Sequence, residues 1–146
     1  MTYYYLGSIT VVVPSKFTMK TAKVHRLGEL QLRILKVLWG KREGTVGEVH
    51  EVLSAEDDFA YTTIATMLRK MEARGLVKHR TEGRTFIYAA TVAEHEVTKG
   101  ALNDLVDRFF EGSLAEAMNH LLTSREVSKE ELAKLQKLIE ERKKKL

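Results

Sequence analysis

The segment from Ala60 to Gly75, AYTTIATMLRKMEARG, constrains the fold of this chain more than any other stretch. Its apolar residues recur with the period of about 3.6 residues that places side chains on one face of an α-helix. The predicted inner face holds Ala60, Ile64, Met67, Leu68 and Met71. The opposite face carries no acid and holds Thr62, Thr63, Thr66, Arg69 and Lys70. Gly75 is placed to end the helix, because the left-handed conformation after a helix favours glycine.

An outer face of this kind suits the major groove of DNA. Hydroxyl groups can bond base edges or phosphates, threonine methyls can contact thymine methyls, and long cations reach phosphates or guanine. The plainer alternative is a solvated helix face, and for one isolated helix it is the more common case. The neighbouring sequence must therefore decide between the two.

The residues after Gly75 have the pattern of a β-hairpin. Residues 76–81 and 84–90 are rich in Val, Thr, Ile, Phe and Tyr, and Glu82-Gly83 is predicted as the turn between them. Lys78, Arg80 and Arg84 make this hairpin basic. A helix followed by a basic hairpin is typical of a winged helix-turn-helix, with the hairpin lying against the DNA backbone or in the minor groove. An equally good alternative is that the cations protect the edge of a sheet.

Two earlier helices complete the predicted motif. The first spans residues 27–41, begins near Gly28, and has an apolar face of Leu27, Leu30, Ile34, Leu35 and Leu38, with Trp39 packing near its end. Glu43-Gly44 is predicted as a turn. The second helix opens at Thr45, whose hydroxyl and the Glu48 carboxylate form a capping box. Its inward residues are Val49, Val52 and Leu53, and a short acidic connection over residues 54–59 leads to the third helix.

The last third of the chain contains three further capping patterns. They are Thr91 with Glu94, Ser113 with Glu116 and Ser128 with Glu131, and each predicts the start of a helix. Short amphipathic helices cannot bury their apolar faces alone, so we expect this region to pair with a second copy of the chain. The alternative is that the helices fold back on their own winged helix. The residues expected to form the dimer are Leu102, Leu105, Phe109, Leu114, Met118, Leu121, Leu132, Leu135 and Ile139.

Charge is distributed unevenly along the chain. The net charge of +4 divides into +4 over residues 1–26, −3 over 27–59, +4 over 60–91 and −1 over 92–146. Outside the N-terminal segment, the positive excess therefore lies on the predicted helix and hairpin, as expected for a nucleic-acid binder. The absence of cysteine excludes disulfides and thiolate metal sites and fits a cytoplasmic location. No apolar run is long enough to cross a membrane, so we expect no direct membrane binding.

The first 24 residues do not resemble part of the domain. This extension is rich in tyrosine and valine, holds the one proline of the chain, Pro14, and has no evident pairing partner. One interpretation is disorder or a misassigned start, with Met19 as the true first residue. The alternatives are an ordered extra strand or a basic arm that touches DNA, formed by Lys16, Lys20, Lys23 and Arg26.

Patterns typical of enzymes are missing from the sequence. His50-Glu51 and His95-Glu96 begin like a zinc-protease motif but lack the second histidine at the required spacing. There is no phosphate-binding loop, dinucleotide fingerprint or nucleophile elbow. We therefore expect no enzymatic activity, no metal site and no cofactor.

Three segments together resemble the penicillinase and methicillin-resistance repressor family, the BlaI/MecI type, to which the copper-responsive CopY repressors are related. They are LGELQLRILKVLWG, TVGEVHEVL and AYTTIATMLRKMEARGLVKHRTEGRTFIYAA, and the resemblance extends from Leu27 to about Glu141. It implies a cytoplasmic homodimeric repressor that binds inverted repeats in double-stranded DNA. It also implies that Thr62, Thr63, Thr66 and Lys70 face the groove.

The same resemblance implies a mode of relief. Repressors of this family are cleaved at an Asn-Phe bond under the control of a membrane β-lactam sensor-protease pathway. The matching position here is Asn119-His120, so the asparagine is kept and the phenylalanine is replaced. Because His120 replaces the phenylalanine, the sequence argues against cleavage by the usual protease. Copper sensing through a cysteine cluster is excluded because the chain has no cysteine.

The sequence therefore predicts a mainly α-helical protein with one small β-hairpin. An N-terminal extension over residues 1–24 precedes a winged helix-turn-helix over 25–91 and a helical dimerisation domain over 92–146. The predicted function is a transcriptional repressor in antibiotic-resistance regulation. The alternatives are a winged helix that binds proteins and a regulator that senses a small molecule among its C-terminal helices.

Overall fold

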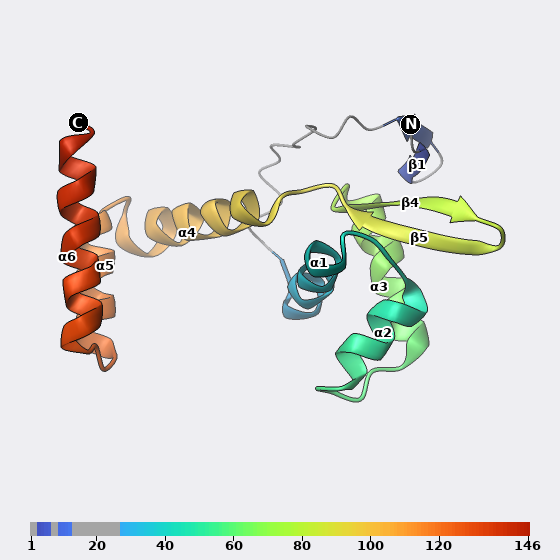
Figure 1. The fold of residues 1–146 in the computed structure, drawn as a ribbon, viewed down its shortest axis with the longest axis horizontal. Helices are drawn as coiled ribbons and strands as arrows, with labels where there is room; N and C mark the ends of the chain where they lie inside the picture. Colours follow the sequence, from blue (N-terminus) through green and yellow to red (C-terminus); the bar gives the residue numbers. More distant parts are fainter. Residues whose placement is uncertain (1–2, 7–8, 13–26) are drawn as a thin grey trace. The chain divides into compact units, whose positions relative to one another are not determined.

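The computed structural model describes residues 3–6, 9–12 and 27–146, and side chains from residue 27 onward. The chain divides into two compact units, Met1–Leu102 and Asn103–Leu146, with the boundary inside helix α4, Glu94–Phe110. The first unit contains α1 (Glu29–Lys41), α2 (Val46–Ser54) and α3 (Tyr61–Ala73), as Figure 1 shows. The strands β3 (Gly44–Thr45), β4 (Val77–Glu82) and β5 (Thr85–Ala90) complete a winged helix-turn-helix, which confirms the predicted fold class.

The β4–β5 hairpin forms the wing. Its two strands pair antiparallel from Val77↔Ala90 to Glu82↔Thr85, so the connecting residues are Gly83 and Arg84. The predicted turn at Glu82-Gly83 was therefore misplaced by one residue. Gly83 has a φ of 62°, and Arg84 is not among the residues of positive φ, which is the pattern of a type II′ hairpin turn.

A second turn also differs from the prediction. Gly44 lies in β3 and pairs with Tyr88 of β5, rather than in a turn with Glu43. The chain reverses instead at Arg42, which has a φ of 73°. A positive φ is uncommon for a residue with a side chain, so this position is held by the pairing that follows it.

Two N-terminal strands extend the sheet. β1 (Tyr3–Leu6) and β2 (Ile9–Val12) form an antiparallel pair, and Tyr5 of β1 pairs with His79 of β4. The strand order is β2-β1-β4-β5-β3. The expectation that nothing in the first residues pairs with later segments was therefore wrong, and the alternative of an ordered extra strand describes this segment. Met19 and the basic residues Lys16, Lys20, Lys23 and Arg26 lie outside the described residues.

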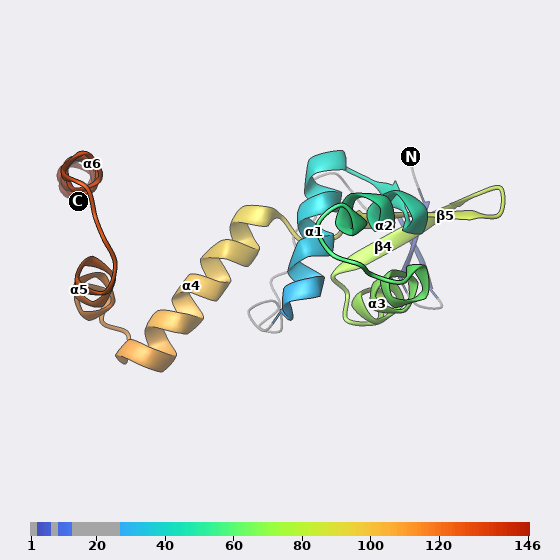
Figure 2. The same ribbon diagram turned by 90° about the horizontal axis from the view of Figure 1, so that it is seen from below.

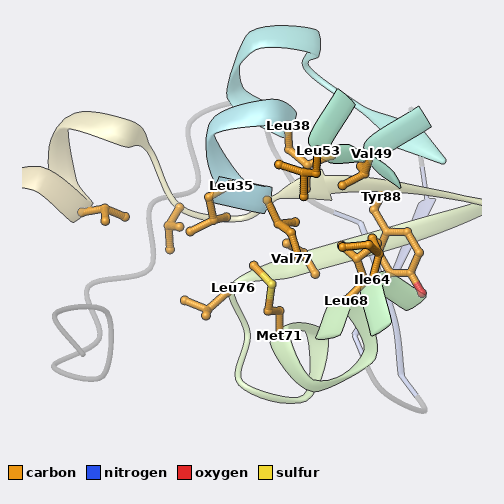
Figure 3. Packing of buried hydrophobic residues seen from close by; sticks show 13 residues of the cluster. Leu35, Leu38, Val49, Leu53, Ile64, Leu68, Met71, Leu76, Val77 and Tyr88 are labelled. Carbon is orange, nitrogen blue, oxygen red and sulfur yellow. The ribbon is translucent and has the colours of Figure 1, made fainter. Parts of the chain in front are cut away.

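The core of the first unit lies where the three helices meet the sheet. Figure 3 shows it as one cluster of side chains contributed by α1, α2, α3 and the hairpin. Its buried members include Ile34, Leu35, Leu38, Val49, Leu53, Ile64, Leu68, Met71, Leu76, Val77 and Tyr88. Leu27, Leu30, Trp39 and Met67 are partly buried against it, as the apolar spacing predicted.

Two predicted core residues are exposed. Val52 of α2 is 42% exposed, because the helix turns only Val49 and Leu53 toward the core. Ala60 is exposed because it lies before the first turn of α3, as its N-cap, and not on its inner face.

The start of α4 belongs to the core of the winged helix. The indole Nε1 of Trp39 donates a hydrogen bond to the carbonyl of Val92 at 2.9 Å, and the side chains of Val92 and Val97 are buried in the cluster. The domain boundary predicted between residues 91 and 92 would separate these two valines from the residues they pack against.

Capping patterns predicted the helix starts unequally well. Thr45 and Glu48 form the expected reciprocal pair, and the hydroxyls of Ser113 and Ser128 accept hydrogen bonds from the amides of Glu116 and Glu131. The predicted box at Thr91 and Glu94 was wrong. α4 begins at Glu94, and the hydroxyl of the buried Thr91 instead donates a short hydrogen bond to the carbonyl of Gly75.

The second unit contains the end of α4, α5 (Leu114–Ser124) and α6 (Lys129–Lys144). Glu111 and Gly112, both with positive φ, make the turn between α4 and α5. Ala117 is buried and the ring of Phe110 lies 5.8 Å from that of His120, while most large apolar side chains of α5 and α6 are exposed. Within the described residues, none of the helices combines the length and apolar composition needed to cross a membrane.

Replacing Gly75 tests how α3 is terminated. Gly75 has a φ of 78°, and the amides of Gly75 and Leu76 bond the carbonyls of Glu72 and Met71, both at 2.9 Å. This is a Schellman motif, which needs a left-handed residue at its centre. We expect Gly75→Ala to lower the free energy of unfolding by about 1–2 kcal/mol, measured by chemical denaturation.

Gly40 provides the matched control. It is exposed in α1, and a Cβ added there meets nothing within 4 Å. Gly40→Ala should stabilise the protein by roughly 0.5–1 kcal/mol because alanine favours helix. Equal effects of the two substitutions would contradict the assigned motif.

Candidate nucleic-acid interface

The outer face of α3 is exposed along its whole length. Ile64, Leu68 and Met71 are completely buried on the inner face, and this fixes the rotation of the helix. The residues left on the solvent side are Thr62, Thr63, Thr66, Arg69 and Lys70. These five predicted DNA-binding residues are therefore gathered on one surface, and their contact with DNA stays a prediction.

Arg33 of α1 holds the connection that leads into α3. Its guanidinium donates to the Asp57 carboxylate at 2.7 Å and to the Glu56 carboxylate at 2.8 Å. The same group lies 5.2 Å from the centre of the Phe59 ring. The two ion pairs raise the pKa of Arg33, the Asp57 bond contributing most. Arg33 thus neutralises part of an acidic turn beside the basic helix, a contact between distant residues that helical periodicity does not predict.

Tyr61 begins α3 and presents an exposed aromatic ring. The ring is 54% exposed and meets the imidazole of His50 edge-on, with centres 5.8 Å apart. His50 Nε2 lies 2.7 Å from the carbonyl oxygen of Phe59, so this nitrogen carries the proton and donates it. The first residues of a reading helix commonly reach base edges or phosphates. The sequence pattern did not indicate Tyr61, because the predicted DNA-binding face is defined by small and basic side chains.

A buried pair joins α3 to the wing. The Glu72 carboxylate of α3 lies 2.5 Å from Nδ1 of His79 on β4, and the two residues are 7% and 8% exposed. Phe86 stacks on the imidazole, with ring centres 4.2 Å apart. The sequence indicated that Glu72 lies toward the buried side of α3 but did not identify its partner. The contact fixes the wing relative to α3.

The two faces of the wing differ in what they meet. Successive side chains of a strand point to opposite faces, and His79 points toward α3, where it bonds Glu72. Lys78 and Arg80 therefore project from the face turned away from α3. The structure does not bring these two predicted DNA-binding residues together with the outer face of α3. Arg84 lies exposed in the turn at the end of the hairpin.

Arg80 is engaged with two carboxylates. Its Nε and one terminal nitrogen bond the carboxylate of Glu43 at 3.3 and 2.6 Å, and the other terminal nitrogen bonds Glu82 at 2.8 Å. These bonds raise the pKa of Arg80, Glu43 contributing most. Burial lowers the pKa of the Lys78 ammonium. The roles of Arg80 and Lys78 as phosphate contacts stay predictions, and Arg80 has a structural partner that the sequence did not indicate.

Within the described part of the chain, no group of three or more histidine, aspartate or glutamate side chains is placed to hold a metal ion.

A known protein family and several known proteins match most of this chain. The Penicillinase repressor family matches residues 27–141. The Penicillinase repressor of Bacillus licheniformis is 28% identical over 121 residues, covering 83% of this chain and 94% of that protein. The Transcriptional regulator BlaI of Mycobacterium tuberculosis is 36% identical over 103 residues, covering 69% of this chain and 75% of that protein. A solution structure of Bacillus licheniformis BlaI, in its monomeric form with the blaP half-operator, matches 50% of this chain and 89% of that one, with 29% identity and a TM-score of 0.44.

The pair of Glu72 and His79 can be tested through stability. Glu72→Ala leaves a buried imidazole without its carboxylate, and breaking a buried pair in this way costs about 3 kcal/mol of unfolding free energy. Replacing both partners, as Glu72→Leu with His79→Phe, should cost less, because the carboxylate and the imidazole are then removed together. Chemical denaturation measures both.

Glu51→Ala is the control. Glu51 is exposed on α2, so its loss should change the unfolding free energy by no more than about 0.5 kcal/mol. If Glu72→Ala were as mild as Glu51→Ala, the pair would not be a structural link between α3 and the wing.

Proposed function

Because this chain belongs to the penicillinase repressor family, we propose that it is a DNA-binding transcriptional repressor that acts as a homodimer on inverted-repeat operators. Bound over a promoter, it would exclude polymerase until its affinity for DNA or for its partner copy is lost. The match over residues 27–141 includes both the winged helix and the C-terminal helices, so the proposal concerns the whole described chain after its first strands.

The observation that carries the proposal is the outer face of α3. Its threonines are short enough to let the helix backbone approach the bases, and Arg69 and Lys70 follow on the same face. Tyr61 adds a hydroxyl at the start of the helix, where phosphate contacts are common. A helix that recognised a protein would instead present several apolar anchors, and beyond Tyr61 the outer face of α3 offers none. This contrast favours DNA over the protein-binding alternative.

The wing would supply a second point of contact. Arg84 lies in the exposed turn between β4 and β5, and both views of the ribbon show the hairpin projecting beyond α1, α2 and α3 (Figures 1 and 2). A cation at this position can meet the sugar-phosphate backbone beside the groove that α3 enters. Such contacts supply affinity and register and make binding sensitive to salt.

The C-terminal helices support pairing of two copies. Within one chain, many of the predicted dimer residues are exposed, which is costly for apolar side chains of this size. They are Leu102, Leu105, Phe109, Leu114, Leu121, Leu132 and Ile139, while Met118 and Leu135 are partly buried. A second copy would cover this surface and place two reading helices on one two-fold axis.

Proteolysis of the C-terminal region is the proposed route of relief, through a membrane sensor-protease pathway. The candidate bond, Asn119-His120, is exposed inside α5. The hydroxyl of Thr123 donates to the carbonyls of Asn119 and His120 at 2.9 and 3.2 Å. A protease binds its substrate extended, so this turn of α5 would have to unwind before cleavage.

Salt dependence of DNA binding tests the proposed contacts. Lys70→Ala combined with Arg84→Ala removes one exposed cation from α3 and one from the wing. If each meets one phosphate, the slope of log affinity against log salt should fall by about 0.9 per contact. Mobility-shift titrations on a duplex selected by the wild-type protein from a random library measure this slope.

Lys36→Ala is the matched control, because Lys36 is an exposed cation of α1 outside the proposed interface. It should leave the slope unchanged. An unchanged slope in the double variant would argue against these assignments, and a wild-type protein that selects no duplex would refute the proposed function.

Paired substitutions test the dimer. Phe109→Ser with Ile139→Ser removes two exposed apolar side chains, 68% and 56% exposed in the single chain, that we place in the dimer interface. We expect the dissociation constant of the dimer, measured by analytical ultracentrifugation, to rise at least about tenfold. Affinity for an inverted repeat should fall with it, and affinity for a half-site should not. Lys137→Ser, an exposed change on the same α6, should leave the dimer intact. Dimers of unchanged stability would contradict the assigned interface.

A further inference from the structure

The end of the wing lacks support from the core. At its base, Val77, His79 and Tyr88 are buried, whereas residues 81–86 are all exposed. The hairpin extends past the helices in both views (Figures 1 and 2). β1 pairs with β4 at His79, and β3 pairs with β5 at Ile87 and Tyr88, so the hairpin is held over its base and middle. A small change of direction there displaces Arg84, at the exposed end, by much more.

Arg80 lies between the buried base and the exposed end. Its guanidinium bonds Glu43 through two nitrogens, at 2.6 and 3.3 Å, and Glu82 through the third, at 2.8 Å. A planar guanidinium held on both sides has little freedom left to turn. The pair with Glu82 stays within β4, whereas the pair with Glu43 links the hairpin to a different part of the unit.

Glu43 is fixed by its place in the chain. It stands between Arg42, whose φ of 73° ends α1, and Gly44, which pairs with Tyr88 of β5. Its carboxylate is therefore carried by backbone anchored both to α1 and to the sheet. The Glu43–Arg80 bond ties the middle of the wing to that anchored point.

Charge and orientation both argue against Arg80 as a DNA ligand. All three nitrogens of the Arg80 guanidinium are engaged by two carboxylates, so its charge is already neutralised and is not offered to a phosphate. Arg80 also projects from the face of the hairpin turned away from α3, as strand alternation requires.

We propose that Arg80 is a positioning residue, clamped by Glu43 and Glu82, that sets the direction of the wing so that Arg84 meets the DNA backbone while α3 occupies the groove. This inference rests on the proposed function as a DNA-binding repressor. It deepens that proposal by separating a residue that aims the wing from one that touches the duplex.

Glu43→Gln distinguishes the two roles by the sign of its effect. If Arg80 were a phosphate ligand, removing a competing carboxylate would strengthen DNA binding and steepen its salt dependence. Because Arg80 positions the wing, the loss of Glu43 weakens binding instead, although the protein becomes more positive. The salt slope should also fall by about 0.9, as the phosphate contact of Arg84 is lost.

The experiment compares Glu43→Gln, Arg80→Gln and the double variant of the full-length protein, by mobility shift over a range of salt. The DNA is a duplex selected by the wild-type protein from a random library. We expect each single variant to bind about fivefold more weakly and the double variant to bind no more weakly than either, because both break one contact. Arg80→Lys should restore only part of the loss, since an ammonium cannot bond both carboxylates with a planar fork.

Glu51→Gln is the charge-matched control. It removes one exposed carboxylate from α2 without touching the clamp, and it should leave binding unchanged or slightly stronger. Heat unfolding of each variant separates an effect on the wing from a loss of the fold. If Arg80→Gln fails to fold, Glu43→Gln alone still shows whether DNA affinity rises or falls when the clamp is opened.

Hydrogen exchange without DNA gives a second readout. Opening the clamp should speed exchange of the amides over residues 81–86 while leaving those of α3 protected. Tighter binding by Glu43→Gln, binding equal to wild type, or unchanged exchange in the wing would each overturn the proposal. A wild-type protein that selects no duplex would refute the DNA-binding function, and the exchange rates would still test the clamp separately.

Discussion

The burial of one side of α3 is the constraint on which the rest of the structure depends. Ile64, Leu68 and Met71 are completely buried, and an amphipathic helix fixed in this way cannot rotate without exposing them. The threonine and basic side is therefore held toward solvent by the core and not by any ligand. Such preorganisation means that little ordering is left for the moment of binding. The core accordingly determines which residues are presented, and the Schellman turn at Gly75 determines where the wing begins.

Polar contacts then determine how the wing stands relative to that helix. Glu72 and His79 join α3 to β4 inside the protein, and Arg80 joins β4 to Glu43, the residue before β3, nearer the surface. The buried contact costs more to break, because it strands a polar group away from water. The surface contact is weaker and lies further along the hairpin, where leverage on Arg84 is greater. The Glu72–His79 contact therefore holds the base of the wing against α3, and the contacts of Arg80 set the direction of its end.

Much of this arrangement follows from local patterns in the sequence, since apolar spacing, a capping box and β-prone composition predict the three helices, the hairpin and the exposed residues of α3. The failures have a common physical cause. The turn at Gly83-Arg84, the role of Thr91 and the exposure of Val52 depend on which neighbours meet in space. The hydrogen bonds of Arg80 and Glu72 join residues 37 and 7 positions apart, which local patterns do not encode. The alternation of β4 does follow from the sequence, however, because a buried Val77 places His79 on the side of α3 and Lys78 and Arg80 together on the opposite face.

The C-terminal helices extend the same logic from one chain to two. A single α3 reads few base pairs, so a module of this size gains both affinity and selectivity when a second copy is linked to it on an inverted repeat. If the proposed dimer forms through the apolar residues of α4, α5 and α6, then its stability and its occupancy of an operator are coupled. Unwinding α5 around Asn119 would disturb the packing of Leu121 and its neighbours as well as expose the backbone. A cut there would act by converting one divalent binder into two weak monovalent ones, without altering α3 or the wing.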